Sequence, residues 1–291
     1  MLMRFLYLPL LAFALYGAEP LPILGIAHGA FKVSNLDKAR AFYTGVLGYQ
    51  EAFAIKDESG AVTMAFFKIN DDQYIEISPG LKPDENDRMT HLALLTSDIE
   101  KLHRALNDLG LSPTAIKPGR DGNRNFSVRD PDGHRLEFVQ YMPGSWHTNA
   151  RGKFMDSRRI STELRHIGIS VKNLDAAMAF YRDKLGFQET WRGGPTDAEL
   201  RWVNMRMPGP RGDYIEFMLH DKPPTRAQLG SMHHLCLEVP EIQAPYRTLL
   251  ERGIPAEERY KPRIGRNRKW LLNLFDPDGS RTELMEPKTV D

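Results

Sequence analysis

Four histidines and four glutamates recur at matched places in the sequence, and both residue types are common ligands of divalent metals. The spacing between His28 and His166 equals that between Asn35 and Asn173, and each histidine opens a short apolar stretch. Two further histidines open similar stretches, and each of the four is followed by one glutamate set between apolar residues. The eight residues are His28, Glu76, His91, Glu137, His166, Glu216, His234 and Glu283. Imidazole nitrogens and carboxylate oxygens together suit a divalent metal that keeps open coordination positions.

The elements that position these residues are predicted to be strands, whose side chains alternate between two faces. His28 lies on the face opposite Phe31, and Glu76 lies between Ile75 and Ile77. The other six residues occur in the same setting. If the apolar faces pack on helices, every histidine and glutamate points to the other side of the sheet. A single histidine of this kind is more often structural, but four coincidences of both residue types favour a metal site.

The chain repeats itself at two levels. Its two halves carry the same landmarks, and each half closes on a turn of sequence Asp-Pro-Asp-Gly, at 130–133 and 276–279. Each half divides again into units that begin with a strand and a helix and end in a glutamate-containing strand. The units span 23–80, 90–141, 164–220 and 232–287. We therefore predict an α+β fold of four β-α-β-β-β modules.

The helix of the first unit has clear ends and an apolar stripe. Asn35 is the expected N-cap and Gly48 the expected stop, as are Asn173 and Gly186 in the third unit. The stripe at helical spacing consists of Leu36, Ala39, Phe42, Tyr43, Val46 and Leu47.

The composition and the N-terminal segment limit which classes of protein this chain could belong to. Lysine plus arginine (39) nearly balances aspartate plus glutamate (38), so charge indicates neither a nucleic acid nor an anionic membrane as partner. The single cysteine, Cys236, excludes an intrachain disulfide. Arg4 precedes an apolar run, so we predict a signal peptide at 1–18 and an exported protein that leaves no segment inserted in the membrane. The expected domains are 22–143 and 164–287, joined by a solvated linker at 144–163 whose His147 has no assigned role.

These residues resemble the vicinal oxygen chelate superfamily, which includes glyoxalase I, methylmalonyl-CoA epimerase, extradiol dioxygenases and bleomycin resistance proteins. The resemblance rests on His166-Ile-Gly-Ile-Ser-Val with Asn173-Leu-Asp, on Phe180-Tyr181, and on Asp-Pro-Asp-Gly-x-Arg-x-Glu endings at Glu137 and Glu283. It implies two cup-shaped domains, each built from two β-α-β-β-β modules, with a divalent metal inside the cup: zinc, nickel, cobalt, manganese or ferrous iron. The chain would be a monomer or a homodimer.

Matched by position, the resemblance implies one ligand set of His28, Glu76, His91 and Glu137, and another of His166, Glu216, His234 and Glu283. Modules pair differently in some members, so the sets could be exchanged, but each pairing still yields two histidines and two glutamates.

Three functions of the resembled superfamily compete. The first is lyase or isomerase chemistry of the glyoxalase I or epimerase type through a metal-stabilised enediolate, in which Glu76 or Glu216 acts as general base and Glu137 or Glu283 mainly as ligand. The presence of glutamate in all four closing strands favours this function. An exported protein would, however, need a substrate other than a cytosolic glutathione adduct.

The second function is ring cleavage by an extradiol-type dioxygenase with ferrous iron on two histidines and one carboxylate. The chain length of 291 residues fits, but ring-cleaving members carry a histidine in the loop before the last Asp-Pro turn and a tyrosine nearby. Here Ser127 and Asn273 stand near the tyrosine position, and neither loop contains a histidine.

The third function is non-catalytic binding of a small ligand, as in resistance proteins, which typically lack the metal ligands. In each case the partner would be a small, oxygen-rich and anionic substrate. Basic and aromatic residues expected near the mouths of the cups are Arg120, Arg124, Arg201, Trp202, Arg206, Arg266 and Arg268. Solvated loop arginines are an equally good interpretation of this group.

Overall fold

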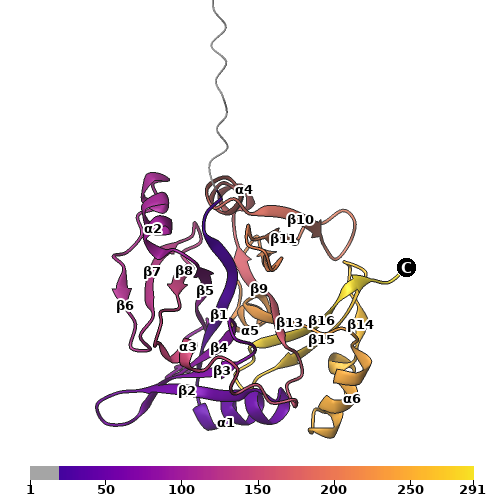
Figure 1. Cartoon of the computed structure of the whole chain (residues 1–291). Coiled ribbons are helices and arrows are strands. Elements are labelled where there is room, and N and C mark those ends of the chain that lie inside the picture. Colours follow the sequence, from indigo (N-terminus) through magenta and orange to yellow (C-terminus); the bar gives the residue numbers. More distant parts are fainter. Residues whose placement is uncertain (1–19) are drawn as a thin grey trace, which may run out of the picture.

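Each half of the chain forms one eight-stranded sheet that curls into a cup (Figure 1). This is a computed structural model that describes residues 20–291, so the predicted signal peptide at 1–18 lies outside the described residues. We call the sheet of β1–β8 cup 1 and that of β9–β16 cup 2. The strand orders are β2-β3-β4-β1-β5-β8-β7-β6 and β10-β11-β12-β9-β13-β16-β15-β14. The predicted α+β fold of four modules in two cup-shaped domains is confirmed.

The strands of cup 1 are β1 (Ile23–Val33), β2 (Gln50–Lys56), β3 (Val62–Lys68), β4 (Tyr74–Pro79), β5 (Met89–Thr96), β6 (Lys117–Pro118), β7 (Arg124–Arg129) and β8 (Arg135–Gln140). Those of cup 2 are β9 (Glu163–Val171), β10 (Gln188–Gly193), β11 (Trp202–Arg206), β12 (Tyr214–Leu219), β13 (His234–Glu238), β14 (Arg263–Ile264), β15 (Lys269–Phe275) and β16 (Arg281–Thr289). The first strands of the two modules in each cup pair antiparallel, β1 with β5 and β9 with β13. Consecutive modules of the chain therefore share a cup.

Short helices lie around the two sheets (Figure 1). They are α1 (Leu36–Arg40), α2 (Ile99–Asp108), α3 (Trp146–Asn149), α4 (Leu174–Met178), α5 (Arg226–Met232) and α6 (Gln243–Glu251), with a short 3₁₀-helix, η3 (Glu258–Tyr260). α1 and α4 continue as π-helices, η1 (Ala41–Val46) and η2 (Ala179–Lys184), which the sequence did not predict. No helix in the described part of the chain is long and apolar enough to cross a membrane.

The predicted helix ends are confirmed. The side chain of Asn35 accepts a hydrogen bond from the amide of Lys38, and Asn173 does the same for Ala176, so both asparagines cap their helices. Gly48 and Gly186 follow with φ of 78° and 75°, the left-handed conformation that ends a helix at glycine.

The apolar face of each sheet packs on its helices, as alternation predicted. Phe31, Ile75 and Ile77 of cup 1 and Ile167, Ile215 and Phe217 of cup 2 belong to the buried core. That packing leaves the opposite face of each sheet, which carries the histidines and glutamates, turned toward the inside of the cup.

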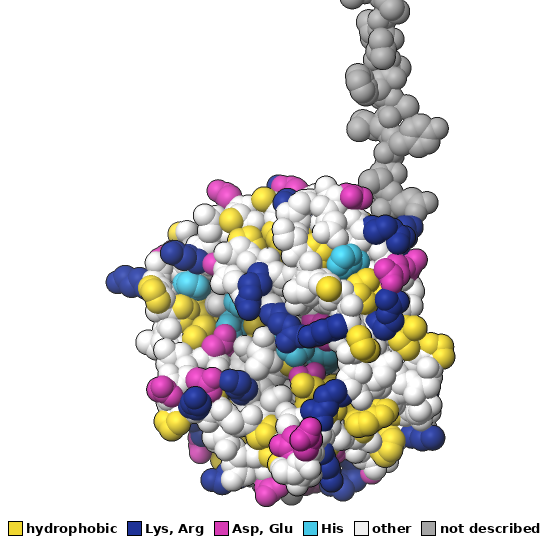
Figure 2. All heavy atoms as spheres, turned by 90° about the vertical axis from the view of Figure 1, so that its left-hand side faces the viewer, with side chains coloured by type: hydrophobic (Ala, Val, Ile, Leu, Met, Phe, Trp, Pro, Cys, Tyr) yellow, Lys and Arg dark blue, Asp and Glu magenta, His cyan; other side chains and the backbone are white. Residues whose placement is uncertain are grey.

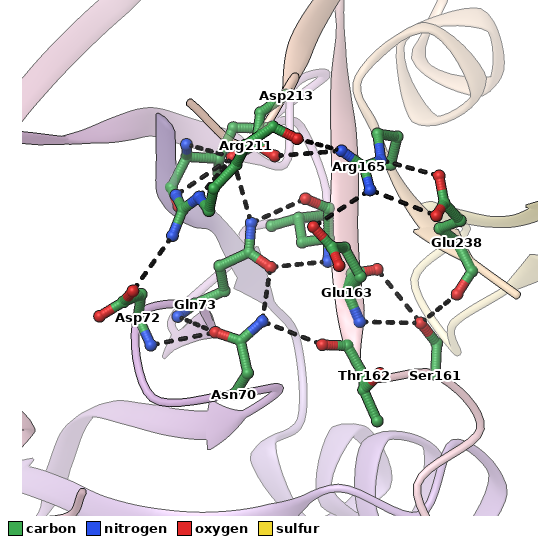
Figure 3. A network of polar contacts seen from close by, with 12 residues as sticks. Asn70, Asp72, Gln73, Ser161, Thr162, Glu163, Arg165, Arg211, Asp213 and Glu238 are labelled. Carbon is green, nitrogen blue, oxygen red and sulfur yellow. Dashed lines mark hydrogen bonds and ion pairs between the residues drawn. The ribbon is translucent and has the colours of Figure 1, made fainter. Parts of the chain in front are cut away.

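A buried polar network joins the two domains where β1 and β9 lie side by side (Figures 1 and 3). The side-chain amide of Gln73 bonds the backbone of Leu164 in both directions, at 2.8 and 2.9 Å. Asp213 accepts a hydrogen bond from the amide of Ile26 at 2.8 Å and is flanked by Arg211 and Arg165 (Figure 3). Because these partners belong to different domains and are buried, the network fixes how the domains sit together.

The same helix position in each domain also reaches the Asp-Pro turn of the other domain. The hydroxyl of Tyr43 donates to Asp276 at 3.3 Å, and that of Tyr181 donates to Asp130 at 3.0 Å. The two contacts are related by the repeat, so the domain interface is nearly symmetric.

The linker at 144–163 is not the solvated connector that its composition suggested. Ser145, His147, Ala150 and Ser161 are buried, and α3 packs against cup 1. Apolar contacts override the polar composition here, because His147 lies among the rings of Phe53, Tyr74 and Tyr141.

Candidate metal centres in the two cups

Strand register places the eight predicted residues on two rungs inside each cup. In cup 1 one rung runs through Phe66, Glu76, Ala30 and His91. A neighbouring rung of cup 1 carries His28, Ala93 and Glu137. In cup 2 the corresponding rungs are Asn204-Glu216-Gly168-His234 and His166-Cys236-Glu283. Within each cup the four side chains come from the first and last strands of two modules, as predicted.

In cup 1 the four side chains converge. The Nε2 atoms of His28 and His91 are 3.0 Å apart, and Glu76 Oε2 lies 3.3 Å from His28 Nε2 and 3.8 Å from His91 Nε2. Glu137 Oε2 lies 3.9 Å from His91 Nε2 on the other side, and Arg135 forms an ion pair with this carboxylate. All four also line one cavity.

Burial disfavours charge on the four candidate ligands of cup 1. Burial lowers the pKa of His28 to about 3 and holds that of His91 well below its usual value, so both imidazoles are uncharged. Burial, together with the charge of Glu137, holds the pKa of Glu76 well above its usual value. Burial raises the pKa of Glu137 to about 6 despite Arg135. Two uncharged imidazoles and the raised pKa values of both carboxyls indicate a site that would gain from a bound cation.

This geometry fits a divalent metal. Two nitrogens that each bind one ion at about 2.1 Å lie about 3 Å apart when the bonds are at right angles, and His28 and His91 have this spacing. The hydroxyl of Thr90 lies 3.1 Å from His91 Nδ1 and orients that ring. His28, Glu76 and His91 thus have ligand atoms close enough together to hold zinc, ferrous iron or a similar ion. Glu137, 3.9 Å from His91 Nε2, is the candidate fourth ligand.

In cup 2 the same four positions converge, but an arginine joins them. The Nε2 atoms of His166 and His234 are 3.0 Å apart, and Glu216 Oε2 lies 3.3 Å from His234 Nε2. Glu283 Oε2 is 3.9 Å from His234 Nε2. Arg281 Nη2 lies 2.9 Å from that same Nε2. The same Nη2 is 2.7 Å from His234 Nδ1, so the guanidinium lies against the imidazole ring and adds a positive charge within the set.

Cup 2 also contains the single cysteine. Cys236 lies beside His166 on its rung and within ligand range of His166 and Glu283. Burial holds the pKa of this thiol well above its usual value, so it is a neutral, inert group at neutral pH.

The walls of the two cups differ. Cup 1 is narrowed by its own aromatic rings, since Phe66 and Phe53 lie next to Glu76 across β3 and β2, and its cavity measures about 270 Å³. Seen from the side of β6–β8, basic side chains gather around histidine and acidic side chains (Figure 2). In cup 2 Asn204 and Trp191 take the places of these two phenylalanines, and the cavity measures about 520 Å³.

His147 is a residue of cup 1 that the sequence did not reveal. It lines the cavity that contains the four ligands, its Nδ1 lies 2.7 Å from the side-chain amide of Asn123, and its Nε2 is buried without a hydrogen-bond partner among the described residues. It comes from an aperiodic linker, so strand alternation had no means of placing it.

The arginines and the tryptophan considered from the sequence, together with the remaining histidines, fall into four groups. Arg120 lines the cavity of cup 1, and Trp202, Arg266 and Arg268 line that of cup 2. Arg124, Arg201 and Arg206 instead bond Glu100, Asp221 and Gln188. His134 and His233 lie at the domain interface, where both ring Nε2 atoms face the hydroxyl of Ser170. His103 and His220 bond backbone carbonyls outside the cups.

Comparisons with known proteins agree with this geometry. The family model Glyoxalase/Bleomycin resistance protein/Dioxygenase superfamily matches residues 25–138 and 163–284, which is most of the chain. Ethylmalonyl-CoA/methylmalonyl-CoA epimerase of Cereibacter sphaeroides is 28% identical over 119 residues, which are 40% of this chain and 89% of the epimerase. A probable lactoylglutathione lyase of Vibrio parahaemolyticus is 30% identical over 123 residues, with the same coverage of 40% and 89%.

Two dioxygenases are similar to the chain over both domains. An iron-dependent extradiol dioxygenase of Rhodococcus jostii is 23% identical over 219 residues, 66% of this chain and 67% of that enzyme. Among solved structures, a variant of homoprotocatechuate 2,3-dioxygenase from B. fuscum has a TM-score of 0.67 at 19% identity, covering 91% of this chain and 72% of the other. At this level of identity, the structural similarity establishes the fold alone. Because the family model matches both domains, the chain belongs to the Glyoxalase/Bleomycin resistance protein/Dioxygenase superfamily.

Proposed function

We propose that cup 1 is the active centre of a divalent-metal-dependent lyase or isomerase that acts on a small substrate with two vicinal oxygens. Relatives in the superfamily include an epimerase and a probable lyase, and cup 1 retains two histidines and two glutamates around one cavity. A metal held by His28, Glu76, His91 and Glu137 would act as Lewis acid toward the two substrate oxygens. The protein's own residues then have to move a proton between neighbouring carbons.

The observation that carries the proposal is the unequal environment of the two carboxylates. Glu137 is held by the guanidinium of Arg135, whereas Glu76 lies against the two uncharged histidines and forms no ion pair with a lysine or arginine among the described residues. Burial holds the pKa of Glu76 well above its usual value, so this carboxylate gains from taking up a proton. Glu76 accepts the proton from the substrate carbon and returns it to the adjacent one. Glu137 stays in place as a ligand.

Four protein ligands also argue against oxygen chemistry. If all four side chains held the metal, the two substrate oxygens would take the positions left open and dioxygen would have none. In addition, Ser127 and Asn273 lie across from Glu137 and Glu283, where ring-cleaving relatives would need a proton-handling side chain. Glu216 is the corresponding candidate base of cup 2.

One observation favours ring cleavage as a second candidate. His147 brings an imidazole into cup 1 from a different segment, and its buried Nε2 lacks a partner among the described residues. Such a group could handle protons on oxygen intermediates, so the dioxygenase alternative makes a distinct prediction: catechols should be consumed together with oxygen.

The test starts from full-length protein purified without oxygen. Its metal content is measured, and it is assayed with 2-oxoaldehyde thiol adducts and with catechols at an oxygen electrode. Glu76→Gln should keep the metal on three remaining ligands and lose turnover by about 10²- to 10⁴-fold. Glu137→Gln, the matched control, should chiefly weaken metal binding. Oxygen uptake with catechols would contradict the lyase or isomerase assignment, and protein that binds no metal would contradict both enzymatic functions.

We also propose that the protein acts outside the cytoplasm, on the strength of the apolar segment that follows Arg4. The physiological substrate would then be a dicarbonyl or hydroxycarbonyl compound available there. Comparing the mass of the protein from cell envelope fractions with that of the full chain would test export.

A further inference from the structure

Arg281 lies inside the ligand set of cup 2. Its Nη2 is 2.9 Å from His234 Nε2, and its Nη1 is 3.6 Å from Glu283 Oε2. A guanidinium always carries its charge and has donors in a fixed plane. One positive group therefore already contacts two of the four residues that would otherwise hold a metal.

The guanidinium of Arg281 lies against the ring of His234 and reaches both ring nitrogens. Its Nη2 is 2.7 Å from His234 Nδ1 and 2.9 Å from Nε2, while the carbonyl oxygen of Met232 lies 2.9 Å from Nδ1. The ring takes this place because Gly168 has no side chain. A Cβ at Gly168 would lie 2.0 Å from His234 Nδ1. Cup 1 has Ala30 at the equivalent position beside His91.

The equivalent arginine of cup 1 behaves differently. Arg135 forms an ion pair with Glu137 but makes no contact with His91 or His28 among those recorded for the described residues. The imidazoles of cup 1 also line its cavity, whereas those of cup 2 do not. The two cups thus have the same two histidines and two glutamates by type. They differ in whether an arginine contacts a histidine and in whether the histidines line the cavity.

The cavity of cup 2 has the walls of a site for a flat anion. Trp191, Trp202, Met218 and Leu271 give it apolar and aromatic lining. Glu216 and Glu283 line it as well, so an anion would have to bind on the side of the arginines. Arg263 also lines the cavity and has no ion-pair partner among the described residues, and Arg281 Nε is buried without a hydrogen bond. A cavity of about 520 Å³ falls in the usual range of about 300–1,000 Å³ for small-molecule sites, whereas the 270 Å³ of cup 1 falls below it.

We propose that cup 2 is a metal-independent binding site for an aryl carboxylate, in which Arg281 supplies the positive charge that a metal would supply in cup 1. The aromatic ring packs on Trp191 and Trp202. The carboxylate is bound by the free donors of Arg281 and by Arg263, because guanidinium groups pair with carboxylates through two parallel hydrogen bonds. The inference goes beyond the proposed chemistry of cup 1 and does not depend on it.

The experiment uses the full-length protein after treatment with a chelator, and naphthoate as the probe. Naphthoate should quench tryptophan fluorescence with saturation, and the neutral naphthamide should bind at least about tenfold more weakly. Arg281→Gln should raise the Kd for naphthoate about tenfold or more, and the exposed Arg263→Gln should raise it several-fold without affecting folding. Arg135→Gln is the matched control and should change the Kd less than about twofold.

Each outcome decides the question. Binding that requires added metal, equal affinity for naphthamide, or no saturable quenching of the wild-type protein would overturn the proposal. So would loss of binding in Arg135→Gln with unchanged binding in Arg263→Gln. Because the probe is applied to metal-free protein, a failure of the chemistry proposed for cup 1 would leave naphthoate binding intact, and the two results are separable.

Discussion

Cup 1 and cup 2 carry the same ligands on the same rungs and differ in what surrounds them. In cup 1 the ligands line a small cavity whose walls are Phe66, the inserted His147 and neighbouring rings. In cup 2 Asn204 replaces Phe66, no linker residue enters among the lining residues, and the cavity is nearly twice as large. The same set of two histidines and two glutamates thus lies in two cavities with different lining residues and volumes.

The difference teaches that strand register alone does not decide what a cup binds. Register brings two imidazoles to 3.0 Å in both cups. The neighbouring residues decide which cation the imidazoles meet. Ala30 in cup 1 and Gly168 in cup 2 set the position of the histidine ring beside them. Arg135 then pairs with its glutamate in cup 1, whereas Arg281 contacts His234 in cup 2.

The largest expected effect concerns metal content. Wild-type protein should bind one divalent ion per chain, and His28→Ala with Glu137→Ala should bind none, since only two ligands remain in cup 1. His166→Ala with Glu283→Ala should leave the ion in place. Elemental analysis of each protein after loading and gel filtration measures this.

Removing the guanidinium sharpens the same comparison. Arg281→Ala frees His234 Nε2 and should raise the metal content to about two ions per chain, while Arg135→Ala should leave it at about one. If the wild-type protein bound two ions, Arg281 would not prevent a metal from binding in cup 2. The two cups would then not differ in metal binding.

The next prediction compares how tightly the walls of the two cavities are packed. Phe66 is buried against Phe53 and the ring of His147, so Phe66→Ala should cost about 3–5 kcal/mol of unfolding free energy. Asn204 occupies the same place in cup 2, and its Oδ1 is buried without a partner among the described residues. Asn204→Ala should therefore change stability by less than about 1 kcal/mol. Urea unfolding at fixed pH measures both, and equal losses would mean that the walls do not differ in packing.

The cups should also respond to pH in opposite directions. Burial raises the pKa of Glu137 to about 6 and holds that of Glu76 higher than usual, so a metal that enters cup 1 must displace protons. Metal affinity should rise about tenfold or more from about pH 6 to about pH 8.

In cup 2, burial raises the pKa of Glu283 to about 7. Raising the pH through this value adds a negative charge beside Arg281, so naphthoate affinity should fall severalfold over the same interval. Titrations with metal and with naphthoate at both pH values measure the two trends. Trends of the same sign would contradict the assignment of a cation to one cup and an anion to the other.

Much of this site could be predicted because strand alternation is a two-residue rule. Glu76 between Ile75 and Ile77 has only one face available, and the same holds for the other seven ligands, so the sequence predicts a common side for all eight. Arg281 was also within reach of that rule, since it lies two residues before Glu283 on β16 and must share its face.

Other features had no such signal. His147 follows a proline- and glycine-containing segment with no period, and only tertiary contacts with Tyr141 and Tyr74 bury it. The difference between Arg135 and Arg281 was equally out of reach, because both stand in the same Asp-Pro-Asp-Gly-x-Arg-x-Glu motif. It arises from the size of the residue next to each histidine and from the packing around each ring.

The smallest expected effect distinguishes the two tyrosine contacts between the domains. Tyr43 bonds Asp276 Oδ2, which has no other hydrogen-bond partner recorded among the described residues, whereas Tyr181 bonds Asp130 Oδ2, which His134 also contacts at 2.8 Å. Tyr43→Phe leaves a buried carboxylate oxygen unsatisfied and should cost about 1–3 kcal/mol, while Tyr181→Phe should cost only about 0.5–1.5 kcal/mol.

Burial raises the pKa of Asp276 to about 6, which sets the pH at which the comparison should be made. At about pH 5 the carboxyl of Asp276 is mostly protonated, and the penalty for an ionised group without its donor is smaller. The difference between the two variants should thus grow as the pH rises to about 7. Urea unfolding of both at the two pH values measures it. A constant or inverted difference would show that His134 does not compensate Asp130, and that the interface is as symmetric in energy as it is in geometry.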